Sequence, residues 1–480
     1  MTAPSLEQQL AAAAPVRAVR DALAPLGGGA WLVGGVVRDA LLGRPLVDVD
    51  VAVDGDPERA ARAIAKALHG PVFSLSDQFG AWRVLDSERS ISCDLSPLQG
   101  ETIEADLAKR DFTINAIAVP LDGGAPIDPR GGMSDVEAGV LRVLGAQAYA
   151  DDPLRALRLV RLAAELGMAP DGETERLTQQ AASRLDEPSG ERVFAELRRL
   201  LVAPQALDGL ELARRLGILG AVVPELGALE GVEQNRYHHL DAYAHTVEVL
   251  REQIALLETE RLDELFGEHV GALRAVLAEP LADGLTRGEA LRFGALFHDV
   301  AKPQTQRVED GVVLGFPGHD VAGDEIVRDV FRRLKTSERL RSHVGALARH
   351  HLRLGFLVRE RPLDRAAIYR YLSRCDPVAV DVTVLSCADR LATRGRRADD
   401  AIAAHLDLAR EVVGPALRWH ADGPPRPPLR GDELAAELDI EPGPRLGELL
   451  AGLTEAAYAG TVTTRDEAVA LARKLMAERG

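Results

Sequence analysis

Residues 32–53, LVGGVVRDALLGRPLVDVDVAV, hold the pattern that decides the fold of this 480-residue chain. The segment contains β-prone runs on either side of a glycine pair and a short helical piece. Side chains of a strand alternate between its two faces, so Asp48 and Asp50 are predicted to project to the same side of one strand. Two carboxylates in this arrangement predict a site for divalent cations such as Mg²⁺.

The residues upstream of this aspartate pair make the pattern specific. A lone Asp-x-Asp is usually surface or turn chemistry, but here GGVVRDALLG precedes it at a fixed interval. Gly34 and Gly35 allow backbone to approach a phosphate closely, and Arg38 supplies positive charge beside them. Paired cations suit phosphoryl or nucleotidyl transfer, because they activate the attacking hydroxyl and neutralise the departing pyrophosphate.

Apolar periodicity separates a mixed front from a helical remainder. Up to about Asp135, β-prone runs alternate with Ala-rich helical pieces such as ERAARAIAKAL. From Asp151 onward, apolar residues recur every three or four positions, which predicts amphipathic helices. The predicted fold class is therefore α+β, with a small α/β head, a helical neck and body, and a helical domain that is rich in histidine. The predicted domains are 1–145, 146–232, 233–415 and 416–480, the last of which follows the Pro-rich stretch Asp422–Gly431.

Composition and charge set limits on the class of protein. With 46% hydrophobic and 27% charged residues, the chain is predicted to be globular and soluble rather than disordered. Its three cysteines have no CxxC spacing, which fits a reducing cytoplasm, and neither a secretion signal nor a membrane span is expected. The net charge of −17 argues at face value against nucleic acid. Arginines nevertheless cluster locally, and the sequence leaves open whether each cluster contacts RNA or pairs with nearby acids.

Two further polar motifs follow the aspartate pair. SISCDL places Asp94 in a β-prone run, where it is either a third metal-facing carboxylate or a cap or salt-bridge partner. DLAKRDFTINAIAV contains Arg110, Asp111 and Asn115 ahead of an apolar run. These polar residues could form a capped turn that faces solvent. Because they lead directly into an apolar run, we favour a role in recognition of a sugar.

Together these stretches resemble the class II tRNA nucleotidyltransferase and poly(A) polymerase family, from about Trp31 to Leu201. The resemblance rests on GGVVRDALLG with DVD, DLAKRDFTINA, IDPRGG, DDPLRALRLVRLAAELG and ERVFAELRRLL. It implies a polymerase β-like head in which Asp48 and Asp50 hold catalytic Mg²⁺, with Asp94 as a third catalytic candidate. It also implies nucleotide contacts from Arg110, Asp111 and Asn115. Lys109 replaces the family's usual first arginine, which keeps the charge but loses the forked geometry.

In this family the DDPLR segment selects the base in place of a nucleic acid template. By position, Asp152 and Arg155 would present one acceptor and one donor on one helical face, which suits the edge of cytosine or adenine. Arg158 and Arg161 complete the predicted nucleotide-binding set. The resemblance implies that the 3′-hydroxyl of a tRNA attacks the α-phosphate of CTP or ATP while pyrophosphate leaves.

A second set of motifs resembles the HD metal-dependent phosphohydrolase superfamily. The stretches are YHHLDAYAHTVEVL, ALFHDVAKP, FPGHDVAGDEI, ARHHL and CADRLA. The resemblance implies a divalent metal, of unspecified identity, on four residues, and a second ion or substrate phosphate on two or three others. The first set is His245, His298, Asp299 and Asp389, and the second is His319 and His350, with His351 as a further candidate. Whether this domain hydrolyses a phosphate ester is left open.

Two other functions compete with nucleotide addition to tRNA. A bacterial poly(A) polymerase shares the front half, but such enzymes often carry a strongly basic C-terminal extension, which this chain lacks. An HD phosphohydrolase with a non-catalytic, RNA-binding front half conflicts with the intact aspartate pair. The preferred prediction is a cytoplasmic tRNA nucleotidyltransferase that adds CMP, AMP or both. The segment 94–106, which contains Pro97 and Gly100, is short, so addition of only CC or only A stays open. The oligomeric state is not predicted from the sequence.

Overall fold

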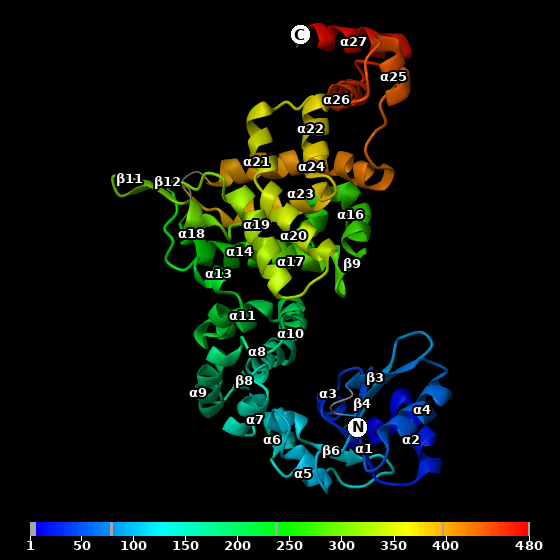
Figure 1. The fold of residues 1–480 in the computed structure, drawn as a ribbon. Helices are drawn as coiled ribbons and strands as arrows, with labels where there is room; N and C mark the ends of the chain where they lie inside the picture. The colour runs from blue at the N-terminus through cyan, green and yellow to red at the C-terminus, as the bar shows by residue number, and fades with distance from the viewer. Residues whose placement is uncertain (1–5, 77–79, 236–238, 396–397, 479–480) are drawn as a thin grey trace. The chain divides into compact units, whose positions relative to one another are not determined.

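The computed structural model describes residues 6–76, 80–235, 239–395 and 398–478. It divides into two compact units, Met1–Val222 and Val223–Gly480. The predicted α+β class is confirmed, because the first unit joins a six-stranded sheet to helices and the second is almost wholly helical (Figure 1). The four domain boundaries stay predictions. Among the described residues, no helix is both long and apolar enough to cross a membrane.

The sheet at the start of the first unit has the strand order β3-β4-β5-β2-β1-β6. Strands β2 and β5 run parallel, and the other neighbours are antiparallel. The strands are β1 (Ala30–Val33), β2 (Asp48–Val53), β3 (Val72–Ser76), β4 (Ala81–Leu85), β5 (Ser92–Pro97) and β6 (Ala118–Pro120). The helices around them are α1 (Leu6–Ala12), α2 (Ala14–Leu23), α3 (Gly35–Leu41), α4 (Pro57–Leu68), α5 (Ile103–Leu107) and α6 (Gly132–Ala138).

Alternation along β2 separates the core from the site. Val49 and Val51 are buried in one apolar cluster with residues of α2 and α4, whereas Asp48 and Asp50 are exposed or half-buried. Helix α4 begins after Asp56, whose carboxylate accepts hydrogen bonds from two backbone N–H groups of the first turn. Helices α2 and α4 lie side by side in Figure 1. They therefore cover one face of the sheet and leave the aspartates on the other.

The neck of the first unit is a helical bundle around α8. Its helices are α7 (Ala146–Asp151), α8 (Arg155–Leu166), α9 (Gly172–Ala181), α10 (Gly190–Val202), α11 (Ala206–Arg215) and α12 (Ile218–Val222), with the short strands β7 (Val140–Leu141) and β8 (Ala169–Pro170). Helices α10 and α11 pack against α8. The approach is close at Gly209 of α11, where an added Cβ would lie 2.7 Å from the Cβ of Ala164. The amphipathic helices expected from residue 151 onward are present.

The second unit is built around the buried helix α17, which packs against α14, α20 and α23. Its first helices are α13 (Pro224–Gly227), α14 (Ala242–Glu258), α15 (Arg261–Phe266), α16 (Val270–Leu277), α17 (Arg287–Phe297), α18 (Lys302–Thr305), α19 (His319–Arg333) and α20 (Glu338–His350). They are followed by α21 (Arg353–Leu357), α22 (Arg365–Cys375), α23 (Ala379–Ala392), α24 (Ala398–Asp422), α25 (Gly431–Leu438), α26 (Pro444–Ala459) and α27 (Arg465–Glu478). The short strands are β9 (Pro280–Ala282), β10 (Leu285–Thr286), β11 (Arg307–Glu309) and β12 (Val312–Gly315).

Candidate active site and candidate metal centre

A polar pocket of about 710 Å³ lies on the sheet face that carries Asp48 and Asp50. This volume is within the usual range for a small-molecule site. The pocket wall includes every head and neck residue of the predicted site except Asp152. The predicted residues in the wall are Gly34, Gly35, Arg38, Asp48, Asp50, Asp94, Arg110, Asp111, Asn115, Arg155, Arg158 and Arg161.

The two aspartates of β2 have environments that suit a divalent cation. The Asp50 carboxylate accepts a hydrogen bond from the backbone N–H of Gly35 at 3.3 Å, and the Ser92 hydroxyl donates to Asp48. Burial raises the pKa of Asp50 to about 6, and the charge of Asp94 adds to the rise, whereas Arg110 lowers it. Clustered carboxylate oxygens whose charges repel each other are a donor set that fits Mg²⁺.

The glycine pair keeps the backbone free beside these carboxylates. Gly34 has φ +68°, a conformation that favours glycine, and a Cβ at this position would come to 3.0 Å from Arg110 Nη1. At Gly35 a Cβ would lie 3.3 Å from a carboxylate oxygen of Asp50. A side chain at either position would therefore crowd the site.

Asp94 lies next to the aspartate pair and is also a salt-bridge partner. It is opposite Asp50 in the parallel pairing of β2 and β5. Its two carboxylate oxygens accept hydrogen bonds from Arg83 of β4 at 2.7 and 2.6 Å. The position of Asp94 is therefore consistent with both predictions, that of a third metal-facing carboxylate and that of a salt-bridge partner. Arg83 was not found from the sequence, because its pairing with Asp94 depends on the register of two strands.

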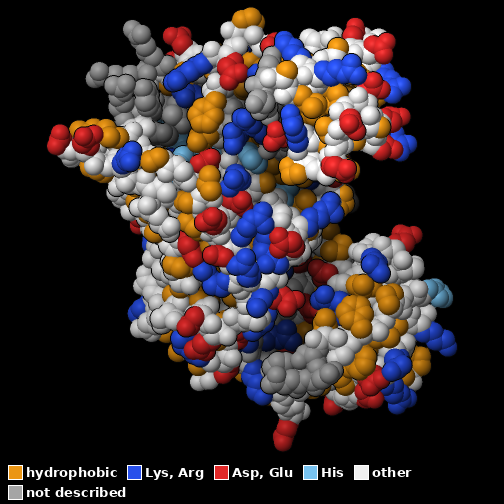
Figure 2. Space-filling view, turned by 45° about the horizontal axis from the view of Figure 1, so that its top comes forward, with side chains coloured by type: hydrophobic (Ala, Val, Ile, Leu, Met, Phe, Trp, Pro, Cys, Tyr) orange, Lys and Arg blue, Asp and Glu red, His pale blue; other side chains and the backbone are white. Residues whose placement is uncertain are grey.

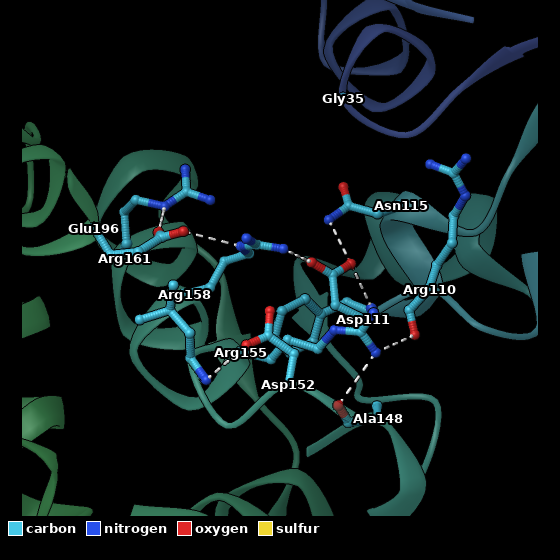
Figure 3. Close-up of polar contacts among 12 residues, drawn as sticks. Gly35, Arg110, Asp111, Asn115, Ala148, Asp152, Arg155, Arg158, Arg161 and Glu196 are labelled. Carbon is cyan, nitrogen blue, oxygen red and sulfur yellow. Dashed lines mark hydrogen bonds and ion pairs between the residues drawn. The ribbon is translucent and has the colours of Figure 1, made fainter. Parts of the chain in front are cut away.

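A chain of hydrogen bonds joins the head motifs to the neck (Figure 3). Arg38 donates to the Asn115 side-chain oxygen at 2.8 Å. Asn115 in turn donates to Asp111 at 3.0 Å. Arg158 of α8 then donates to the second oxygen of Asp111 at 3.0 Å. Burial alone would raise the pKa of Asp111, but Arg158 and Asn115 outweigh it and lower the value to about 2. The predicted sugar-contacting residues are therefore held in one ionised network.

Glu196 of α10 extends this network across the neck. It is 9% exposed, and its carboxylate accepts hydrogen bonds from Arg158 at 3.0 Å and from Arg161 at 2.5 Å. Arg161 also pairs with Glu165. Glu196 lies within ERVFAELRRLL, but the sequence alone did not indicate its role.

On the surface, Lys and Arg side chains are interspersed with Asp and Glu (Figure 2). The Arg158 and Arg161 guanidiniums, in contrast, are fixed in the pocket wall.

The prediction that Asp152 and Arg155 share one helical face is wrong. Helix α7 ends at Asp151, Asp152 is extended, and α8 begins only at Arg155. Pro153 accounts for this break, because proline disfavours the helical conformation of the residue before it. The two side chains also have different partners.

Asp152 pairs with Arg192 of α10 at 2.7 Å, and it is not part of the pocket wall. Arg155 lines the pocket, and its guanidinium donates to the backbone carbonyls of Lys109, Arg110 and Ala148 at 3.0–3.2 Å (Figure 3). Arg155 therefore ties the start of α8 to the RDFT segment.

In the second unit, the four residues of the HD pattern come together. Nε2 of His245 lies 3.1 Å from a carboxylate oxygen of Asp389 and 3.6 Å from one of Asp299. Nε2 of His298 lies 3.0 Å from Asp299 and 3.9 Å from Asp389. Burial disfavours a charge on His298, but the adjoining Asp299 outweighs burial and raises the His298 pKa.

A second group of possible ligands shares Asp299 with the first. It contains His319 and His351, whose Nε2 atoms lie 3.4 and 3.7 Å from the other carboxylate oxygen of Asp299. His350, which the sequence favoured, belongs to neither group among the described residues. It is the last residue of α20, and adjacent positions at a helix end point in different directions. The further candidate His351, rather than His350, therefore lies beside Asp299.

Hydrogen bonds orient these imidazoles as metal ligands. Nδ1 of His298, His319 and His351 each lies 2.6–2.8 Å from the backbone carbonyl three residues earlier, so Nε2 faces the cluster. Nε2 of His298 lies close to Asp299, but among the described residues it makes no contact with the angles of a hydrogen bond. Imidazole and carboxylate donors in this arrangement fit a transition metal ion. Lys302, three residues after Asp299, contacts its carboxylate at 2.5 Å, a contact that the HD pattern alone does not indicate.

Comparison with known proteins places this chain in a family. Family models match a poly A polymerase head domain over residues 30–142, a probable RNA and SrmB-binding site of polymerase A over 167–229, and an HD domain over 268–394. An A-adding tRNA nucleotidyltransferase of Deinococcus radiodurans is 36% identical and aligns over 95% of this chain and 97% of its own. A CC-adding tRNA nucleotidyltransferase of Thermus thermophilus is 34% identical over 92% of both chains.

Solved structures agree in fold. A Thermotoga maritima CCA-adding enzyme complexed with tRNA has a TM-score of 0.60 at 19% identity, and the match covers 98% of this chain and 99% of that one. The family resemblance predicted from the motifs is confirmed. This chain belongs to the tRNA nucleotidyltransferase family of enzymes, with a poly(A) polymerase-type head and an attached HD domain.

Proposed function

We propose that this chain transfers CMP or AMP from CTP or ATP to the 3′ end of a tRNA without a nucleic acid template. The observation that carries the proposal is the pocket of the first unit. It joins two carboxylates on one strand face to a wall of arginines, and so offers both a cation site and a complement to a triphosphate. The membership of the family and the names of its relatives supply the substrate class.

Asp48 and Asp50 are the proposed ligands of Mg²⁺ in this pocket. The bound cations would help to activate the 3′-hydroxyl of the RNA and to neutralise the departing pyrophosphate. The protein's own groups would position the nucleotide. Gly34 and Gly35 permit close approach of its phosphates, and the arginine wall binds their charge. Asp111 and Asn115, held by Arg158 and Arg38, are the proposed contacts to the sugar.

Arg155 is the proposed contact to the base. Its guanidinium is held by three backbone carbonyls, which fixes its direction at the start of α8. Asp152 keeps a proposed role as its acceptor partner only if the Arg192 pair opens on nucleotide binding, since its carboxylate lies outside the pocket wall. This requirement distinguishes the two residues experimentally.

We further propose that the chain adds only part of the CCA sequence. Three relatives that align over more than nine tenths of the chain are named for partial addition, one for A and two for CC. Segment 94–106 is compact, because only residues 98–102 separate the end of β5 from the start of α5. A short connection here leaves little chain for a long mobile loop.

A stepwise incorporation assay tests this proposal. Purified protein is incubated with Mg²⁺, labelled CTP or ATP, and tRNA transcripts that end before CCA, after CC, or after CCA. A partial enzyme extends one of the first two transcripts, either with CMP to CC or with a single AMP, and leaves the completed CCA end unchanged. Long AMP tails on all three RNAs would instead indicate a poly(A) polymerase, and no incorporation would refute nucleotide transfer.

Metal binding in the head pocket is expected to weaken below pH 6. A proton competes with the cation once the pH falls below the Asp50 pKa of about 6, so affinity should drop by about tenfold per pH unit there. Above that value the carboxylate is ionised and affinity levels off. Titration of Mn²⁺ between pH 5 and 8, followed by electron paramagnetic resonance, measures the profile. Asp50→Asn is the control, which should bind the ion weakly at every pH and show no step near pH 6; profiles identical to wild type would contradict the assignment.

In the second unit, we propose that His245, His298, Asp299 and Asp389 hold a divalent ion, with His319 and His351 available for a second. Such a centre would supply a Lewis acid for hydrolysis of a phosphate ester. Backbone carbonyls accept hydrogen bonds from Nδ1 of His298, His319 and His351. This leaves Nε2 of each imidazole available to bind a metal ion, which supports the proposal. His350, half-buried at the end of α20, is not retained in the set.

The buried, unpaired cysteines and the tRNA substrate favour a cytoplasmic location.

Asp389→Asn is expected to remove the metal from this centre and to leave nucleotide addition within about twofold of wild type. The variant loses a charged ligand, and the loss of a first-sphere carboxylate commonly abolishes retention of an ion. Metal content after dialysis is measured by plasma mass spectrometry. Asp329→Asn removes an equal charge from the surface of α19 and should retain the metal. Unchanged metal content in Asp389→Asn would refute the centre.

A further inference from the structure

A small pocket of about 250 Å³ adjoins the candidate metal centre of the second unit. His351 and Asp389, which belong to that centre, form part of its wall. The remaining wall comes from α21, α23 and α24 and from the short 3₁₀ segment Val358–Glu360, which pack together in the unit. A ligand in this pocket would therefore lie directly beside the candidate metal ligands.

Two arginines give the pocket an excess of positive charge. Arg390 follows Asp389 on α23, and Arg359 lies in the 3₁₀ segment at the pocket edge. Within the described ranges, neither guanidinium forms an ion pair, in contrast to most arginines of this unit. Asp389 is the one carboxylate of the wall, and a metal ion would neutralise it. The pocket therefore has two cationic side chains available for an anion.

Arg390 is also incompletely satisfied. Its Nε atom is buried and has no hydrogen-bond partner among the described residues. An unpaired N–H that is removed from water is destabilising, so such a group is expected to meet a ligand or an ordered water. Neutral polar groups complete the wall, including Ser386 and His405, which lie 3.2 Å apart. The donor set suits the oxygens of a phosphate group.

The size of the pocket limits what can enter it. Its volume of about 250 Å³ lies below the range of about 300–1,000 Å³ that is usual for sites that enclose a drug-sized ligand. A volume of this size is enough for a phosphate group together with a small part of the molecule that carries it. The positive side chains of the wall would bind the phosphate end of such a ligand.

We propose that Arg390 and Arg359 form an anion subsite that holds the phosphate group of a terminal phosphate ester against the metal centre of the HD domain. This inference rests on the proposed metal centre and adds the residues that bind the substrate there. It assigns Arg390 and Arg359 as binding residues. It also assigns the ligand class as a phosphate at the end of a nucleotide or RNA.

Equilibrium dialysis with inorganic phosphate tests the subsite on the full chain, with and without Mn²⁺. Arg390→Met removes the charge and keeps an unbranched, flexible stem, and Arg426→Met is a matched control at an exposed position. Phosphate bound in the head pocket is common to all three proteins and cancels. We expect wild type and Arg426→Met to bind one more phosphate ion per chain than Arg390→Met does. Equal binding by all three would overturn the proposal.

A second measurement keeps the test independent of folding and of the metal. Arg390→Lys retains the charge and should recover part of the affinity, whereas a fault in folding would not be rescued in this way. With p-nitrophenyl phosphate as substrate, Arg390→Met should raise KM about tenfold and change kcat less. A loss confined to kcat would contradict a binding role. If Mn²⁺ is not retained but the phosphate difference persists, the metal centre fails and the subsite stands.

A third arm separates the two sources of the phosphate. A nucleoside 3′-monophosphate and a short RNA with a 3′-terminal phosphate are each used to compete with inorganic phosphate. Competition by either one that is lost in Arg390→Met supports the subsite and identifies the source. Competition that is unchanged in Arg390→Met, or equal competition by acetate, would overturn the assignment to phosphate.

Discussion

Replacement of Asp50 by Asn is expected to reduce nucleotide incorporation by at least about 10³-fold, which corresponds to roughly 4 kcal/mol of transition-state stabilisation. Asparagine keeps the shape of the side chain and its place on β2, but it removes the charge that would hold a divalent cation. Asp48→Asn should have a comparable effect, because both carboxylates face the same pocket. The measurement is the initial rate of labelled nucleotide transfer to a tRNA transcript.

Asp54→Asn provides the matched control for this pair. Asp54 follows β2 directly and is exposed, so the change removes the same charge near the same strand without reaching the pocket. Its incorporation rate should stay within about twofold of wild type. Binding of tRNA in a gel-shift assay should also be unchanged in Asp50→Asn. A variant that retained a tenth of the wild-type rate would show that Asp50 is not a required metal ligand.

Glu196→Ala is expected to destabilise the neck by about 3 kcal/mol, because it leaves two guanidiniums of α8 without their shared carboxylate. Such a loss corresponds to a decrease of about 10²-fold in the protection of α8 and α10 amides against hydrogen exchange. Nucleotide incorporation should fall by up to about 10²-fold as well, since Arg158 also fixes Asp111 in the pocket.

Hydrogen exchange followed by mass spectrometry measures the first effect, and steady-state kinetics measure the second. Glu191→Ala serves as the control, because Glu191 lies in the first turn of the same helix and is exposed. Its effect should be below about 0.5 kcal/mol. Glu196→Gln, which retains one acceptor, should lie between the two. Protection of α8 that is equal in Glu196→Ala and wild type would show that the network contributes nothing to the neck.

The parts of the site that follow from local periodicity could be predicted from the sequence. The alternation of a strand places Asp48 and Asp50 on one face whatever the rest of the chain does. The HD pattern likewise identified His298 and Asp299, which are adjacent in the chain, and the order of the motifs supplied His245 and Asp389. In these cases a short spacing or a family motif is enough to predict that the side chains lie close together.

The parts that depend on tertiary packing could not be predicted in this way. The salt bridge between Arg83 and Asp94 requires the register of two strands, and the role of Glu196 requires the packing of α10 on α8. The choice between His350 and His351 depends on the direction of one residue at a helix end. The break between α7 and α8, in contrast, has a local cause, since Pro153 could have been used to predict it.

The most direct test of the central claim is a crystal of the full chain soaked with Mn²⁺ and CTP or ATP. Anomalous scattering locates the metal, and we predict a peak in direct contact with carboxylate oxygens of both Asp48 and Asp50 and with phosphate oxygens of the nucleotide. A nucleotide bound in this pocket with its metal ion away from both aspartates would contradict the claim.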